Sequence, residues 1–182
     1  LLRVSVVSGA ALAPLGWIAL KEYQKQRILS FWNPDADPLG AGYTVIQSKI
    51  AVGSGGLLGK GWLSGTQNQL NFLPERHTDF IFSVIGEEWG FVGSLVLLFL
   101  FGLLFYRIYR VGLKAVDWEG RLLCVGVIVW ISTQVLINIC MTIGLMPVVG
   151  LPLPFLSKGG SHVMSTWFAL GLVLSVSRTA RR

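Results

Sequence analysis

The sequence predicts an all-α integral membrane protein with about four transmembrane helices and one large loop. Hydrophobic residues make up 53% of the chain and charged residues 13%, which is about half the charged share of soluble domains. Mean hydropathy is +0.64. Several of the seven tryptophans stand beside charged or loop segments, as aromatic residues at membrane interfaces do. We expect residues 1–182 to form part of a single membrane domain.

The predicted spans are four apolar runs, at residues 4–20, 80–108, 122–145 and 161–177. The first is marginal in length and contains Pro14, which transmembrane helices tolerate when neighbouring groups satisfy the freed carbonyl. Because Glu87 and Glu88 lie in the second run, part of that helix should face water or a protein-lined cavity. The third run carries side chains able to hydrogen-bond between helices, namely Thr133, Gln134 and Asn138.

The start of the chain is apolar and lacks the pattern of a cleaved signal peptide. We therefore expect the chain to be one piece of a longer membrane protein. The net charge of +6 is spread beside the apolar runs instead of forming one patch. This distribution indicates membrane topology and argues against a nucleic-acid partner.

Orientation follows from the basic residues of the short connections. The link between the second and third spans is basic, with Arg107, Arg110, Lys114 and Arg121. The positive-inside rule places this link, and the arginine-rich C-terminal tail, in the cytoplasm. The long loop at about 28–79 is then extracellular. Its aromatic and aliphatic residues, and the helical pattern of 43–52, predict short interfacial helices that pack over the spans.

A polar cluster just before the second span is the candidate functional site. It contains Glu75, Arg76, His77, Thr78 and Asp79, and it faces outward in the predicted topology. An aspartate here can act as a general base, although aspartate before a helix is also a common N-cap. The alternating Glu75, His77 and Asp79 give a weak signal for a metal site.

Two glycine-rich stretches share the predicted outer face with Asp79. The first, 53–61, offers backbone N–H groups and Lys60 to an anion, although such runs are more often flexible turns. The second precedes the last span and contains Ser157, Lys158, Gly159, Gly160 and Ser161.

Long motifs in this chain closely resemble the SEDS family (shape, elongation, division and sporulation), and in particular its elongation branch. The resemblance runs from about Asp35 to the C-terminus. The motifs are Gly40–Tyr43, Gln47–Leu57, Gly59–Trp62, Gly65–Gln67, Phe72–Phe82 and Pro147–Pro154.

This resemblance implies the C-terminal part of a ten-span fold in the bacterial inner membrane. It implies a peptidoglycan glycosyltransferase that polymerises lipid II, an undecaprenyl-pyrophosphate-linked disaccharide peptide, with a class B penicillin-binding protein as partner. Asp79 then matches the family's essential loop aspartate, and Glu75, Arg76, His77 and Thr78 line the same cavity. One departure is Lys158, which stands where the family usually has tyrosine. Because earlier spans are missing, the isolated fragment should be inactive.

The expected reaction needs one base and a set of cations. Asp79 would take the proton of the acceptor hydroxyl, while cations stabilise the leaving diphosphate. The candidates for this charge are a divalent ion (Mg²⁺ or Mn²⁺), Arg76, Lys49, Lys60 and Lys158. Two alternatives stay open. A lipid II flippase would depend on charged residues along the spans, and a non-catalytic scaffold would only present surfaces to the penicillin-binding protein.

Overall fold

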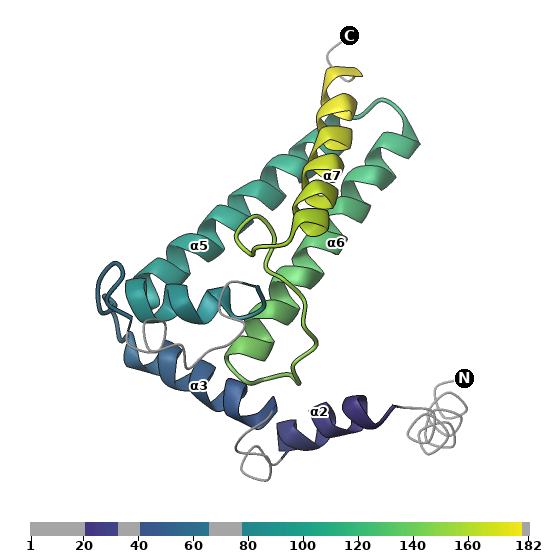
Figure 1. Ribbon diagram of the computed structural model, residues 1–182. Helices are drawn as coiled ribbons and strands as arrows, with labels where there is room; N and C mark the ends of the chain where they lie inside the picture. Colours follow the sequence, from purple (N-terminus) through teal and green to yellow (C-terminus); the bar gives the residue numbers. More distant parts are fainter. Residues whose placement is uncertain (1–20, 33–40, 66–77, 180–182) are drawn as a thin grey trace, which may run out of the picture.

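The computed structural model describes residues 21–32, 41–65 and 78–179, and within these ranges its regular structure is helical (Figure 1). Three of the described helices are long and apolar enough to cross a membrane: α5 (Ile81–Lys114), α6 (Trp118–Thr142) and α7 (Gly160–Thr179). They coincide with the last three apolar runs, and α5 extends beyond the predicted end at 108. The predicted span at 4–20 lies outside the described residues. The predicted all-α membrane fold is confirmed.

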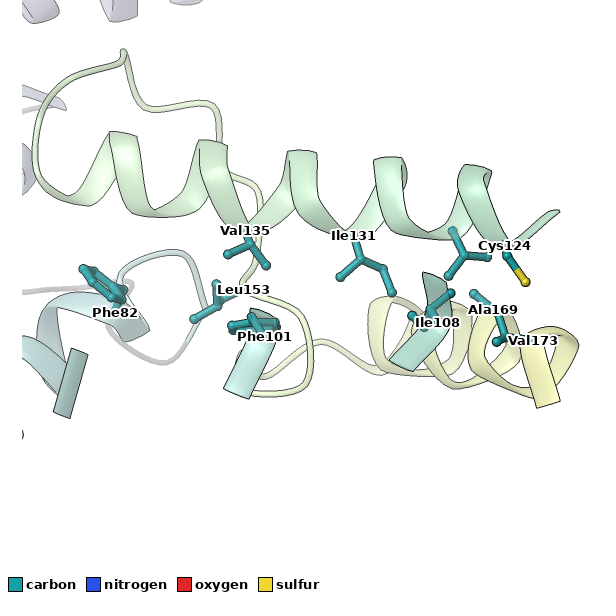
Figure 2. Packing of buried hydrophobic residues seen from close by; sticks show 10 residues of the cluster. Phe82, Phe101, Ile108, Cys124, Ile131, Val135, Leu153, Ala169 and Val173 are labelled. Carbon is teal, nitrogen blue, oxygen red and sulfur yellow. The ribbon is translucent and has the colours of Figure 1, made fainter. Parts of the chain in front are cut away.

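The three long helices pack side by side around one apolar core (Figure 1). Figure 2 shows Ile131 and Val135 of α6 facing side chains from α5 and α7. The buried members of this cluster are Phe82, Phe101, Ile108, Cys124, Val127, Ile131, Val135, Leu153, Ala169 and Val173. Lipid tails are as apolar as these side chains, so close van der Waals packing, more than escape from water, stabilises the contact.

Most of the apolar surface of the bundle points outward. In the most apolar windows of α5, α6 and α7, the protein buries 17%, 28% and 11% of the residues. Large side chains such as Leu95, Phe99 and Leu103 of α5 are exposed. Hydrocarbon, or further transmembrane segments, can cover such surfaces, whereas water would make them costly.

A break at Gly90 divides α5 into two parts, and the bend is visible in Figure 1. The φ angle of Gly90 is 66° and its ψ angle is −159°, a conformation that residues with a Cβ rarely adopt. The part after the break, 91–114, would be about 36 Å long, enough for the ~30 Å hydrocarbon core. The acidic residues Glu87 and Glu88 therefore precede the apolar span, whereas the sequence alone placed them two turns inside it.

The glycine-rich segment 55–61 supplies the hydrogen bonds that this break removes from α5. The amides of Phe91 and Val92 would ordinarily bond to the carbonyls of Glu87 and Glu88. They donate to the carbonyls of Gly56 (2.9 Å) and Leu57 (3.1 Å) instead. The carbonyls of Glu87 and Glu88 in turn accept the amides of Lys60 and Gly61, each at 3.0 Å. Four backbone groups are thus satisfied by exchange between helix and loop, as a membrane environment demands.

Glycine is required at this junction because the two backbones touch. A Cβ at position 55 would lie 1.9 Å from the carbonyl oxygen of Gly86, and one at position 59 would lie 2.1 Å from that of Glu88. The glycine run is therefore a docked structural element, because its amides at Lys60 and Gly61 already serve α5. This arrangement is neither the phosphate cradle nor the flexible turn that the sequence suggests.

Two short helices occupy the same end of the bundle. The helix α3 (Ala41–Ser54) includes the stretch 43–52 where the sequence predicts one, and it packs against α5 and α6. The buried hydroxyl of Ser48 attaches it to the end of α6 by donating to the carbonyl of Thr142 at 2.7 Å. The second helix, α2 (Glu22–Trp32), packs beside α3 and begins before the predicted loop start at 28.

Candidate functional site

Asp79 lies at the end of the bundle that carries α2 and α3, immediately before α5. The N-cap position of α5 belongs to Phe80 and has no side-chain cap hydrogen bond. Asp79 immediately precedes this position, and the reading of Asp79 as a helix cap stays an alternative prediction. Its side chain is half-buried at this end of the fold.

Asn138 of α6 fixes the backbone of Asp79. Its side chain is fully buried, and its amide Nδ2 donates to the carbonyl of Asp79 at 2.8 Å and to the carbonyl of Leu151 at 2.7 Å. A single amide group thus joins the backbone of Asp79 to residues 143–159, the segment between α6 and α7 that is called the reversal below. The sequence identified Asn138 as a hydrogen-bonding residue but assigned its bonds to neighbouring helices.

Ser157 provides a second tether one residue earlier. Its buried hydroxyl donates to the carbonyl of Thr78 and accepts the amide of Leu153 at 2.7 Å. Consecutive carbonyls, those of Thr78 and Asp79, are therefore held by side chains from different elements. Such supports restrict how far the Asp79 carboxylate can move. The predicted contact of Ser157 with substrate stays a prediction, and its position indicates a supporting role.

The Asp79 carboxylate and the Arg27 guanidinium both border the tight turn at Gly150. The φ angle of Gly150 is 78°, and a Cβ added there would lie 3.4 Å from Oδ2 of Asp79 and 4.0 Å from Nη1 of Arg27. Arg27 comes from α2 and reaches across to the reversal, where Nη1 donates to the carbonyls of Val148 and Val149, each at 3.3 Å. A carboxylate and a cation are thus placed around one small turn.

This arrangement suits a transfer reaction in which a proton leaves a hydroxyl while negative charge develops on a departing group. A carboxylate can accept the proton, and a guanidinium can stabilise the charge. Arg27 was not predicted as a site residue, because it lies between the predicted first span at 4–20 and the predicted loop at about 28–79. No local signal in the sequence could have placed α2 beside the segment at 148–150.

Lys60 is engaged by the fold. Its ammonium group lies 2.8 Å from Oε1 of Glu87, whose side chain is 1% exposed. This ion pair compensates the burial of the carboxylate and fastens the docked glycine segment to α5. Glu87 accordingly lies in a protein-lined environment, as the sequence predicts. The contact of Lys60 with substrate stays a prediction.

The other predicted site residues are distributed unevenly. Glu75, Arg76 and His77 lie outside the described residues. Lys49, on α3, runs along Gly144 at the end of α6, with its Cε where a Cβ of residue 144 would stand. Lys158, Gly160 and Ser161 are exposed beside Ser157, and Gly159 is half-buried.

The bond between Gln134 and His162 (3.0 Å) joins α6 to α7, as the sequence predicts for Gln134.

Metal ligands do not gather in the described part of the chain. Within residues 21–32, 41–65 and 78–179, no group of three or more His, Cys, Asp or Glu side chains could hold an ion. Because Glu75 and His77 lie outside these ranges, the divalent cation stays a prediction.

Comparisons with known proteins agree with this architecture. The family model of FtsW, RodA and SpoVE cell cycle proteins matches residues 1–182. The chain is 50% identical over 177 residues to the peptidoglycan glycosyltransferase MrdB of Escherichia coli, covering 97% of this chain and 48% of that protein. It is 44% identical to the peptidoglycan glycosyltransferase RodA of Treponema pallidum, covering 96% of this chain and 40% of the relative.

Solved structures give the same result. One is a chain of a peptidoglycan synthase complex that coordinates polymerization and crosslinking, with a TM-score of 0.72, 41% identity, and coverage of 98% of this chain and 49% of that one. Another is a mutant of the rod shape determining protein RodA of Thermus thermophilus, with a TM-score of 0.57, 34% identity, and coverage of 78% and 50%. The chain spans about half the length of the relatives it matches. The resemblance seen in its motifs is confirmed, and the chain belongs to the FtsW/RodA/SpoVE family of cell cycle proteins.

Proposed function

We propose that this chain carries the catalytic aspartate of a peptidoglycan glycosyltransferase that polymerises lipid II during cell elongation. The observation that carries the proposal is the placement of Asp79. Its backbone is held by Asn138, the preceding carbonyl is held by Ser157, and its carboxylate borders Gly150 opposite Arg27. Relatives named as peptidoglycan glycosyltransferases support the reaction class.

In the proposed reaction, Asp79 accepts the proton of the acceptor sugar hydroxyl. The hydroxyl oxygen then attacks the anomeric carbon of the donor, and the bond from that carbon to the diphosphate breaks. The electron pair of the broken bond goes to the diphosphate oxygen. A base and a source of positive charge suffice, since the leaving diphosphate needs no proton. A divalent cation would add positive charge at the same place.

The site is proposed to face outward from the bacterial inner membrane. The Asp79 end of the bundle and the connection between α5 and α6 lie at opposite ends of the long helices (Figure 1). The connection end is basic, and the described residues responsible are Arg107, Arg110, Lys114, Arg121 and Arg178. The short segment between α6 and α7 at the other end carries only Lys158, and this difference between the short connections supports a cytoplasmic α5–α6 connection and an outer active site. A class B penicillin-binding protein is the proposed partner, consistent with the synthase complex among the similar structures.

The flippase and the scaffold have less support. Transport would call for charged side chains along the apolar spans, but Glu87 precedes the break in α5 and is paired with Lys60. A pure scaffold would not need the side chains of Asn138 and Ser157 to hold the backbone carbonyls of Asp79 and Thr78 in place.

The test uses the full-length protein with its partner synthase, supplied with lipid II and assayed for glycan strands. Replacing Asp79 with asparagine keeps the size of the side chain and removes the base. We expect strand formation to fall by about 10²–10⁴-fold, with thermal stability close to that of the unmodified protein. Polymerisation at the unmodified rate would rule out Asp79 as the base, and an unmodified protein that makes no strands would rule out the activity.

A further inference from the structure

We propose that Arg27 binds the diphosphate of the lipid-linked donor and stabilises it as it leaves. This inference rests on the proposed function, and it concerns a residue of α2 that lies far from the polar cluster in the sequence. The position of its guanidinium beside the same glycine turn as the Asp79 carboxylate is the starting observation.

The guanidinium of Arg27 is anchored by one of its nitrogen atoms. Nη1 donates to the carbonyls of Val148 and Val149, while the described residues provide no hydrogen-bond partner for Nε or Nη2. Both acceptors are neutral, so the positive charge of the guanidinium is not cancelled by this anchoring. The side chain is exposed at the end of the bundle. A fixed cation with spare donors on an accessible surface is ready to receive an anion.

The chemistry of the donor fits this cation. A guanidinium presents planar pairs of N–H groups that match phosphate oxygens better than an ammonium group does. Because the anchor already limits the motion of Arg27, less conformational entropy is lost on binding. The adjacent carboxylate of Asp79 would repel a diphosphate without a nearby cation. Arg27 therefore allows the anion to approach the base closely enough for the reaction.

Two other described candidates for this role are placed less favourably. Lys60 is paired with the buried Glu87 carboxylate. Lys49 lies along Gly144. Arg27, in contrast, borders the turn at Gly150 together with the Asp79 carboxylate.

The test compares two variants and one control in full-length protein reconstituted with its partner synthase. Arg27→Gln removes the charge and keeps a polar amide on a shorter side chain. Arg27→Lys keeps the charge but loses the paired donors. Lys25→Gln is the matched control, since it removes one positive charge from α2 at a side chain that pairs with the exposed Glu22 at 3.0 Å.

The first readout is inhibition of strand formation by undecaprenyl diphosphate, together with the KM for lipid II. We expect Arg27→Gln to weaken inhibition and raise KM by about 10- to 100-fold, as loss of a charged hydrogen-bonding group does. Arg27→Lys should fall between this variant and the unmodified protein, and Lys25→Gln should leave both values unchanged. A purely structural anchor would lower the melting temperature without a selective change in inhibition by the diphosphate. If Arg27→Gln proves unstable, the comparison is made with Arg27→Lys.

The second readout identifies the source of the anion. The assay is repeated in bilayers of phosphatidylcholine alone and in bilayers that also contain phosphatidylglycerol. If Arg27 binds the donor, its variants remain defective in both. A defect confined to bilayers with phosphatidylglycerol would show that Arg27 binds a lipid headgroup and would overturn the proposal. The proposal would also be overturned if undecaprenyl diphosphate inhibited both Arg27 variants as strongly as the unmodified protein. Failure of the unmodified protein to polymerise lipid II would instead overturn the proposed function.

Discussion

Asn138 offers the sharpest test of how the fold positions Asp79. Leucine at this position has nearly the same shape but no polar atoms. The substitution removes the bonds to the carbonyls of Asp79 and Leu151, at 2.8 and 2.7 Å. It also removes the buried Oδ1 atom, which lacks a hydrogen-bond partner in the described structure.

The expected effects on stability and on activity differ in size. Hydrogen bonds between side chains and neighbouring groups in membrane proteins contribute about 0.6 kcal/mol each, so two are worth about 1 kcal/mol. Loss of the unpaired Oδ1 offsets part of this cost. A displacement of Asp79 by about 1 Å, in contrast, would lower the rate by about 10²-fold. We therefore expect Asn138→Leu to fold with slightly reduced stability and to lose most of its kcat, with little change in KM.

The assay is steady-state polymerisation of lipid II, with thermal unfolding in detergent measured in parallel. Thr133→Val is the matched control, because Thr133 is exposed on the same helix and makes no hydrogen bond in the described structure. Ser157→Ala should act on the same backbone, so the kcat loss of the double variant should be smaller than the product of the single losses. A kcat for Asn138→Leu within twofold of the unmodified value would refute the positioning role.

Two further predictions concern the loop and the topology. Lys60→Met removes the cation that pairs with the buried Glu87 carboxylate and should destabilise the protein by about 3 kcal/mol. Adding Glu87→Gln should restore most of that stability in thermal unfolding. A double variant no more stable than Lys60→Met would contradict the role of the ion pair. A cysteine at Ser64 should react with an impermeant thiol reagent in intact cells and one at Lys114 should not, and the reverse labelling would invert the proposed orientation.

The long helices could be predicted from the sequence because lipid imposes a simple rule. Every backbone group in the hydrocarbon must be satisfied within a helix, so sustained hydropathy is enough to identify α5, α6 and α7. The break at Gly90 could not be predicted in this way. Its backbone groups are satisfied by a segment about thirty residues earlier, and the two halves of that exchange carry no shared pattern in the sequence.

The candidate site was predicted unevenly for a similar reason. Asp79 was found because ionisable residues beside an apolar run are costly and conspicuous. Arg27 and Gly150 were missed because their contribution depends on tertiary contacts between α2 and the reversal after α6. Lys60 was taken for a free cation, since its ion pair with Glu87 spans two elements whose packing the sequence does not reveal.

The exchange of hydrogen bonds at Gly90 has a consequence for cooperativity. The amides of Lys60, Gly61, Phe91 and Val92 all depend on the same docked interface. If one of these hydrogen bonds breaks, a polar group of the other segment loses its partner. The glycine segment 55–61 and the residues of α5 around Gly90 should therefore unfold locally as one unit. Hydrogen exchange should therefore give these four amides a common free energy of opening, although they come from two distant stretches of the chain. The glycine segment should then unfold together with α5, as an additional turn of that helix would.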